Sequence, residues 1–132
     1  MAAGLVIQDP GAGAGRPYQA AEAIAIGEMV ALDASGYAMV ANAIVGADHQ
    51  VPTVGIAMHA AALGEQVEVK HLGEVEDADA AFTEGRVLYL AETDGNVTET
   101  IPTTSGDSVQ VVGMTLTSTI WRLDISPTYT TL

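Results

Sequence analysis

The chain has 132 residues and a mass of 13.5 kDa, which suits one ordinary domain. Four Lys and Arg residues against seventeen Asp and Glu residues leave a formal net charge of −13. Such an acidic surface repels the phosphates of nucleic acids and of anionic membranes, so we expect neither as a partner. The absence of cysteine excludes disulfides, thiolate metal sites and cysteine nucleophiles.

The charge balance is unusual for a chain that is 48% hydrophobic and therefore able to fold. Repulsion among its carboxylates is suppressed at high salt, because the Debye length falls to about 3 Å at 1 M. The composition is therefore typical of proteins from salt-loving organisms. The alternative is an acidic surface that serves solubility.

The first 17 residues are rich in Gly and Ala and have a high entropic cost of ordering. We expect a flexible N-terminal arm over residues 1–17 and a single domain over residues 18–132. Within the arm, only Leu5, Val6 and Ile7 form an apolar patch that a partner would bury.

After the arm, short apolar runs separated by turn residues indicate β-strands. Residues 29–40 predict a hairpin, because Asp33-Ala34-Ser35-Gly36 stands between two apolar runs. Residues 66–70 alternate between apolar and polar side chains, which predicts a strand with one solvated face that carries Lys70.

The second half continues in the same way. Asp94-Gly95 between residues 87–90 and 97–101 predicts another hairpin. Residues 119–125 alternate as a strand does. Long helical periodicity is absent, and only residues 20–25 and 78–84 are candidates for one or two helical turns.

Two blocks of the sequence recur with the same displacement. Residues 27–32 (GEMVAL) resemble residues 85–90 (GRVLYL), and residues 54–58 (VGIAM) resemble residues 112–116 (VGMTL), each pair 58 positions apart. The equal spacing predicts two similar β-units that bury each other's apolar faces. We expect an all-β fold, a small barrel or sandwich of about eight to ten strands.

No pattern of residues suits catalysis or a cofactor. His49, His59 and His71 have spacings of 10 and 12, which match no zinc signature. The glycines of residues 11–15 lack the preceding strand and the lysine of a phosphate loop, and no serine lies in a nucleophile elbow. We therefore expect a protein that is not an enzyme and holds no metal and no cofactor.

An acidic cluster in residues 74–79 includes Glu74, Glu76, Asp77 and Asp79. Closely spaced carboxylates bind Ca²⁺ in some loops, but the spacing of an EF-hand is missing. A solvated acidic loop is the preferred interpretation, and a cation site is the alternative.

Aromatic and arginine side chains are the favoured anchors of protein interfaces. Arg16 and Tyr18 stand at the root of the arm, and Trp121, Arg122 and Tyr129 stand near the end of the chain. We expect these residues to contact partners, although Trp121 has a second interpretation as a core residue.

Several Gly-punctuated stretches resemble the capsid decoration (head-stabilising) proteins of tailed viruses. They are IGEMVALDASG at 26–36 with VGIA at 54–57, ALGEQVEV at 62–69, GRVLYL at 85–90, and residues 108–129. The resemblance covers residues 18–129 and rests on strand patterns, not on catalytic residues.

This resemblance implies a β-rich homotrimer on the outer surface of the capsid. Such a protein binds the major capsid protein and stabilises the head without catalysis. The arm fits this role, because Leu5, Val6 and Ile7 can add a strand to a neighbour's sheet edge, with Arg16 and Tyr18 at its root. The alternatives are a turret or fibre base, a tail-associated subunit, or a glycan-binding β-barrel.

Overall fold

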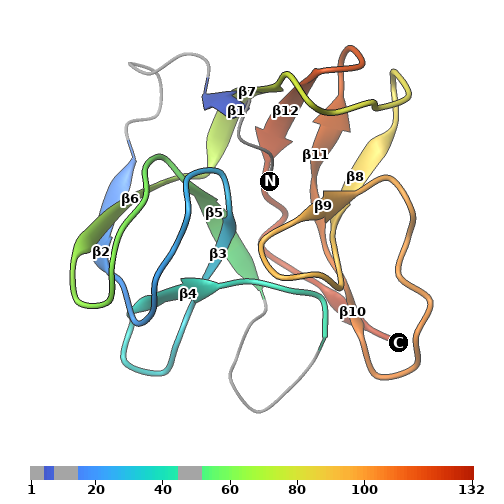
Figure 1. The fold of residues 1–132 in the computed structure, drawn as a ribbon. Coiled ribbons are helices and arrows are strands. Elements are labelled where there is room, and N and C mark those ends of the chain that lie inside the picture. The colour runs from blue at the N-terminus through green and yellow to red at the C-terminus, as the bar shows by residue number, and fades with distance from the viewer. Residues whose placement is uncertain (1–4, 8–14, 45–51) are drawn as a thin grey trace.

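The computed structural model describes residues 5–7, 15–44 and 52–132, with the backbone alone for residues 5–7. The regular elements in these ranges are all β-strands, which confirms the predicted all-β class. The same ranges contain no helix long and apolar enough to cross a membrane. Figure 1 shows two main sheets, one on the left and one on the right, packed as a sandwich.

The left-hand sheet has five antiparallel strands from the first half of the chain. In spatial order they are β2 (Arg16–Gln19), β6 (Gln66–Lys70), β5 (Thr53–Ala57), β3 (Met29–Leu32) and β4 (Ala38–Val40). The β3–β4 pair confirms the predicted hairpin. Its turn is held by Asp33, which accepts hydrogen bonds from the backbone N–H groups of Ser35 and Tyr37 at 2.8 and 2.9 Å.

The right-hand sheet has six antiparallel strands. In spatial order they are β1 (Leu5–Ile7), β7 (Leu72–Asp77), β12 (Ile120–Asp124), β11 (Val111–Thr115), β8 (Val87–Leu90) and β9 (Val97–Thr98). A separate ribbon pairs β10 (Ser108–Val109) with β13 (Thr130–Thr131). The described strands number thirteen, more than expected, because several of them have only two or three residues.

The two sheets repeat one strand order. The order β2-β6-β5-β3-β4 corresponds to β7-β12-β11-β8-β9, and β1 is an addition beside β7. Single hydrogen bonds recur as well: Gly27 N donates to Ala57 O at 2.9 Å, and Gly85 N donates to Thr115 O at 3.1 Å, both partners shifted by 58. The sequence repeat is thus a structural repeat of a first unit (residues 16–70) and a second unit (residues 72–124).

The main hydrophobic core lies between the two sheets. The first unit contributes Met29, Ala31, Met39, Ala41, Ala43 and Ile56, and the second contributes Val75, Leu88, Leu90, Val112, Trp121 and Leu123. Backbone hydrogen bonds also join the units, from Met29 N to Gly95 O at 3.0 Å and from Gly95 N to Ala41 O at 2.7 Å. The units therefore share both packing and backbone pairing.

A second core covers the other face of the five-stranded sheet. The sheet contributes Val30, Ala38, Val40, Ala57, Val67 and Val69, and the loops above it contribute Ala20, Ile24 and Ala61. We call residues 20–25 and 59–65 the alanine-rich cap. Ile24 and Ala61 exchange two backbone hydrogen bonds of 2.9 Å, which join the two halves of the cap. The layers therefore follow the order cap, five-stranded sheet, six-stranded sheet.

Neither candidate for helical turns is helical. Residues 20–25 form part of the cap, and residues 78–84 form a turn followed by irregular chain that packs Phe82 against the main core. Segments this short do not offset the cost of helix nucleation, so tertiary contacts decide their conformation.

The prediction of a solvated Lys70 is wrong, because this side chain is only 1% exposed. Lys70 pairs with Ile56 of β5 and shares the face that packs on the six-stranded sheet. Gly73 leaves space for it, since a Cβ at Gly73 would lie 2.7 Å from Lys70 Cε. The alternation in β6 was predicted correctly, and Gln66 and Glu68 are exposed, but the same face is covered at its Lys70 end.

The acidic cluster is not a solvated loop either. Glu74, Glu76 and Asp77 lie on β7, where Glu74 is exposed and Glu76 is half-buried, whereas Asp77 shares the buried side of the strand with Val75. The Asp77 carboxylate accepts a hydrogen bond from Asp79 N at 3.1 Å, so it caps the turn that follows the strand.

Candidate docking surface

The outer face of the six-stranded sheet carries a row of side chains in register. Val87 on β8 pairs with Met114 on β11, and Met114 pairs with Arg122 on β12. Val87 is 44% exposed and Met114 is 41% exposed, and Arg122 is exposed as well. Large apolar side chains in adjacent rows on a sheet surface are typical of a contact site.

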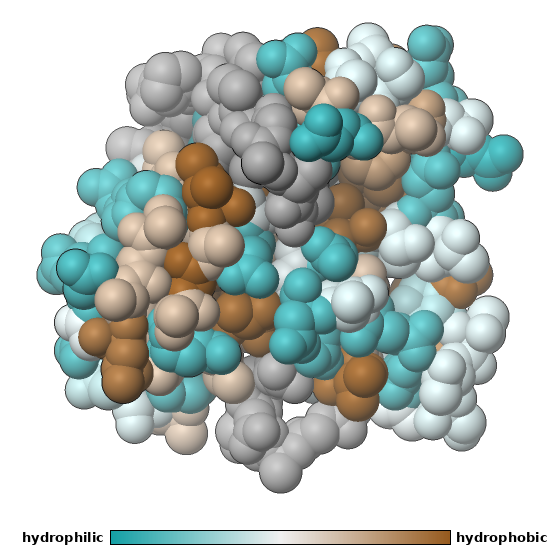
Figure 2. All heavy atoms as spheres, in the orientation of Figure 1, coloured by the Kyte–Doolittle hydropathy of each residue, from teal (hydrophilic) through white to brown (hydrophobic). Residues whose placement is uncertain are grey.

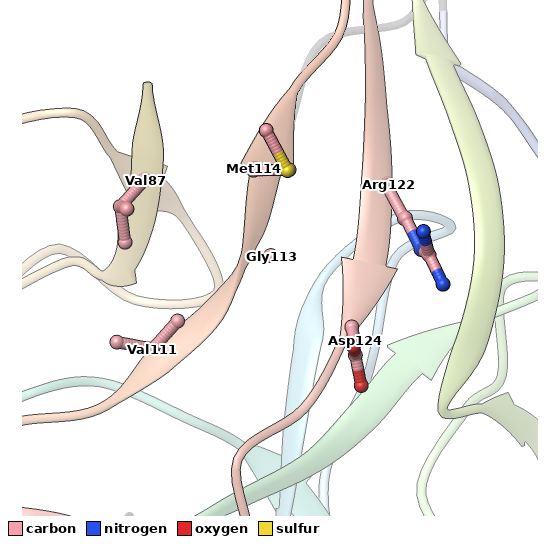
Figure 3. A pocket seen from close by; sticks show the side chains of 6 residues that line it. All are labelled: Val87, Val111, Gly113, Met114, Arg122 and Asp124. Carbon is pink, nitrogen blue, oxygen red and sulfur yellow. The ribbon is translucent and has the colours of Figure 1, made fainter. Parts of the chain in front are cut away.

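The row borders a shallow groove of about 310 Å³, which Figure 3 shows from close by. The groove is lined by Val87, Val111, Gly113, Met114, Arg122 and Asp124. Strand pairing shifts register between Val111 and Gly113, and a Cβ at Gly113 would collide with the carbonyl oxygen of Arg122. Glycine therefore lets β11 and β12 approach closely at the base of the groove.

The same row exists in the first unit, where it is buried. Met29 on β3 pairs with Ile56 on β5, which pairs with Lys70 on β6. Val87 and Met114 follow Met29 and Ile56 by 58 positions each (87 − 29 and 114 − 56). We call the row of Val87, Met114 and Arg122, together with Val111, the open face. Its counterpart is the face by which the first unit packs on the second.

The arm residues lie at two sheet edges. The backbone of Leu5, Val6 and Ile7 forms β1, which pairs with residues 75–77 of β7 in the same chain. Residues 1–4 and 8–14 of the expected arm lie outside the described residues. The first sheet begins at Arg16, two residues before the expected domain boundary, and the Arg16 guanidinium lies 5.7 Å from the centre of the Tyr18 ring.

The three residues near the end of the chain that we expected to contact partners have different environments. Trp121 is fully buried, so the structure confirms its interpretation as a core residue and not as an interface residue. Its indole Nε1 has no hydrogen-bond partner in the described part of the protein. Arg122 lines the groove, and Tyr129 is exposed in the segment before β13. Arg122 and Tyr129 remain accessible to a partner, whereas the Trp121 side chain does not.

The histidines and carboxylates do not converge on a metal site in the described ranges. The His59 Nδ1 lies 2.9 Å from Ala60 O, and its Nε2 accepts a hydrogen bond from Glu68 N at 3.2 Å. His71 is exposed, and His49 lies outside the described residues. His59 thus supports a turn of the backbone.

One carboxyl pair has shifted proton affinity. A hydrogen bond between the side chains of Glu92 and Asp107 raises the pKa of Asp107 and lowers the pKa of Glu92. Desolvation adds to the rise for Asp107, and a hydrogen bond from Thr104 adds to the fall for Glu92. The pair joins the segment after β8 to the segment before β10, so its hydrogen bond holds these two connecting segments together.

Sequence reasoning missed the apolar part of the docking surface. The sequence pattern places Val87, Val111 and Met114 in strands or repeated blocks but does not mark them as contact residues. The signal was present, because the repeat aligns Met29 with Val87 and Ile56 with Met114, but no pattern in the sequence says which copy of a face is exposed.

Comparison with known proteins gives the family. The family model of phage cement proteins matches residues 17–119. A search of the curated proteins finds no match. The matched range begins within β2 and extends past the end of β11, so it contains β8 and β11, the strands that carry the apolar side chains of the open face. Because the match spans well over half of the chain, this protein belongs to the phage cement protein family.

Proposed function

We propose that the chain is a non-enzymatic cement protein on the outer surface of the head of a tailed virus. It binds major capsid protein subunits as a homotrimer and stabilises the shell. The observation that carries this proposal is the family match over residues 17–119.

The surface chemistry is compatible with attachment by burial. The groove offers apolar side chains and one arginine, and burial of apolar area contributes about 25 cal/mol per Å² before the entropy cost of association. A trimer that holds three such sites gains avidity without further contacts.

The segment Leu5–Ile7 is the part of the arm that we assign to strand exchange. In the isolated chain it pairs with β7 through only three residues, at the edge of the sheet. A short edge strand has few hydrogen bonds to lose. It can therefore leave β7 and add to a sheet edge of a capsid subunit.

The test is the decoration of virus heads that lack this protein. Purified full-length protein should occupy sites across the capsid lattice in electron microscopy and should raise the temperature at which the heads lose DNA. A variant without residues 2–15 should fold, by circular dichroism, but should show lower occupancy. Unchanged occupancy would remove the arm from the mechanism, and density at vertices or the tail alone would overturn lattice-wide decoration in favour of a turret or tail subunit.

We also propose a halophilic host, from the net charge of −13. Transfer of the purified protein from molar salt to about 0.1 M should lower its melting temperature, because the Debye length grows from about 3 Å to about 10 Å and carboxylate repulsion returns. A melting temperature that is independent of salt would contradict this part of the proposal.

A further inference from the structure

The two units differ at one edge of their sheets. The strand β2 is an edge of the first sheet, and β7 is the corresponding strand of the second, where β1 is added beside it. Pro17 of β2 pairs with Glu68, and Glu76 of β7 pairs with Ile120. Glu68 and Ile120 each stand two positions before the basic residue of the repeated row in their strands. Pro17 and Glu76 therefore occupy the same place in the two units.

The backbone of Glu76 faces away from β12, on the side where a further strand can bind it. Asp77 N donates to Thr119 O at 2.8 Å, on the side of β12. Successive residues of a strand direct their backbone groups to opposite sides, so the N–H and C=O groups of Glu76 point to the other side. There they meet β1, in which Val6 pairs with Glu76 (Figure 1).

The corresponding edge of the first unit is closed. Met58 N donates to Glu68 O at 2.9 Å, on the side of β5, so the backbone of Glu68 faces away from β2. Its partner Pro17 therefore directs its backbone to the outer side of β2. Proline has no N–H to donate to a further strand, and its presence at a sheet edge opposes strand addition. Glu76 keeps this donor, so of the two edges the one at β7 is able to accept a strand.

The residues of β7 define which strand fits. Val75 and Asp77 lie on the buried side of β7. Opposite residues of an antiparallel pair point to the same side of the sheet, so apolar residues suit the positions opposite these two. Glu76 points to the other side, and its neighbours on the adjacent strands are apolar residues, Ile120 on β12 and Val6 on β1. Its carboxylate therefore favours a Lys or Arg on an incoming strand.

The charge of the chain favours a basic partner strand over a second copy. Glu74, two residues before Glu76, already pairs in register with Arg122, and the net charge is −13. In Figure 2, hydrophilic residues are frequent over the right part of the molecule, where Figure 1 places the second unit. A second copy would bring the same Val6 and the same net charge, so it would add no ion pair at Glu76. A strand with a basic residue between two apolar ones adds that ion pair.

We propose that the edge of β7 at residues 75–77 binds an extended segment of a capsid subunit in which a Lys or Arg stands between two apolar residues. The strand β1 occupies this edge in the isolated chain and leaves it when the arm binds the capsid. The partners thus exchange strands, since the arm is the strand that is given and β7 is the edge that receives one. The inference rests on the proposed function for the identity of the partner and deepens it by naming the receiving edge.

Binding of short peptides to the full-length chain tests the edge. Val6→Pro removes the donor of β1 that faces Glu76, so it should free the edge without removing the arm. In fluorescence anisotropy, a labelled peptide with Leu-Lys-Ile at its centre should bind this variant several-fold more tightly than a peptide with Leu-Val-Ile. A peptide with Leu-Glu-Ile should bind least. Equal affinity of the three peptides would overturn the inference, and so would a preference for Leu-Val-Ile, the sequence that a second copy offers.

Two substitutions at Glu76 in the Val6→Pro background test the role of its charge. Glu76→Lys should invert the order of the peptides, so that Leu-Glu-Ile binds most tightly. Glu76→Gln should bind Leu-Val-Ile as before and should lose the preference for Leu-Lys-Ile. The matched control is Glu84→Gln, which removes one exposed carboxylate outside β7 and should keep the original order. An order that is unchanged in Glu76→Lys would contradict the assignment of Glu76.

Decoration of heads separates this inference from the proposed function. Glu76→Pro gives the second unit the closed edge of the first and leaves the arm available, so head occupancy should fall below that of Glu76→Gln. Circular dichroism verifies folding of both variants. Unchanged occupancy of Glu76→Pro, together with a loss on deletion of residues 2–15, would reject the receiving edge and leave the arm mechanism standing. Peptide binding in solution without any protein on heads would reject the proposed function and leave the specificity of the edge standing.

A competition experiment with the native chain covers the case in which Glu76→Pro does not fold. An excess of the Leu-Lys-Ile peptide should lower the occupancy of the native protein on heads, whereas an excess of Leu-Glu-Ile should not. Occupancy that does not respond to the lysine peptide would reject the receiving edge.

Discussion

Met29, Ile56 and Lys70 in the first unit and Val87, Met114 and Arg122 in the second are the same row of a repeated sheet. The first row is buried between the sheets and the second is exposed at the surface. The difference does not come from local structure, because strand order and register agree. It teaches that the position of a unit in the stack decides whether a face belongs to the core or to the exposed surface.

The opposite faces of the two units differ in how they are covered. In the first unit this face carries small residues such as Val67 and Val69 and is closed by the cap. In the second unit the position that corresponds to Val69 is Trp121, since Val69 pairs with Ala57 and Trp121 pairs with Thr115, 58 positions later. The sheet face that packs against the alanine-rich cap has small side chains, whereas the face that packs against another sheet has large ones.

The largest expected effect on stability comes from a comparison of Ile56, which is buried, with Met114, its exposed counterpart in the second unit. Ile56→Ala should destabilise the protein by about 2–5 kcal/mol, because it removes core contacts and leaves a cavity. Met114→Ala should change the stability by no more than about 0.5 kcal/mol, as an exposed substitution does. Urea unfolding of the two variants beside the native protein measures both. Equal losses at both positions would break the comparison.

An intermediate effect on stability is expected at Trp121, the large residue on the face of the second unit that packs against the first. Trp121→Phe should cost about 1 kcal/mol or less, because the lost packing is offset by removal of a buried indole N–H without a partner in the described structure. Leu123→Ala on the same strand is the control and should cost about 2–5 kcal/mol. Chemical unfolding distinguishes them. A loss for Trp121→Phe as large as for the control would contradict this offset.

The smallest expected effect concerns a carboxyl pair of the second unit, Glu92 and Asp107. The side chains of Glu92 and Asp107 share a hydrogen bond. The first unit has no carboxylate at the position that corresponds to Glu92, because Ala34 stands 58 positions before it. The raised pKa of Asp107 contributes stability below the ordinary Asp range, and this is lost as pH rises through the raised value. The lowered pKa of Glu92 contributes stability above the ordinary Glu range, and this is lost as pH falls through the lowered value.

Asp107→Asn keeps a donor toward Glu92 at every pH. The variant should therefore lose the decline in melting temperature that the native protein shows as pH rises above the ordinary Asp range. Asp124→Asn, at an exposed position on β12, should keep the native profile. The measurement is the melting temperature across this pH range. If the melting temperatures of Asp107→Asn and of the native protein changed with pH in parallel, the hydrogen bond between Asp107 and Glu92 would not be the cause of the pH dependence.

Local patterns in the sequence were enough to predict the β class, the repeat and two hairpins. Asp-Gly turns and alternating residues act over a few neighbours, so their physical cause lies within the segment itself. The helical turns expected at residues 20–25 were wrong for the opposite reason. Ile24 pairs with Ala61, a contact that no local pattern contains.

The sequence by itself determined the β class, the repeat of two similar units and the alternation of side chains in several strands, because backbone geometry and turn chemistry are local. Only the tertiary structure decided which alternate face is exposed. Burial depends on what lies across each sheet, and that is another sheet for Lys70 and no described segment of this chain for Arg122. The two basic residues occupy corresponding positions, and their different surroundings make Lys70 a buried residue and Arg122 an exposed one.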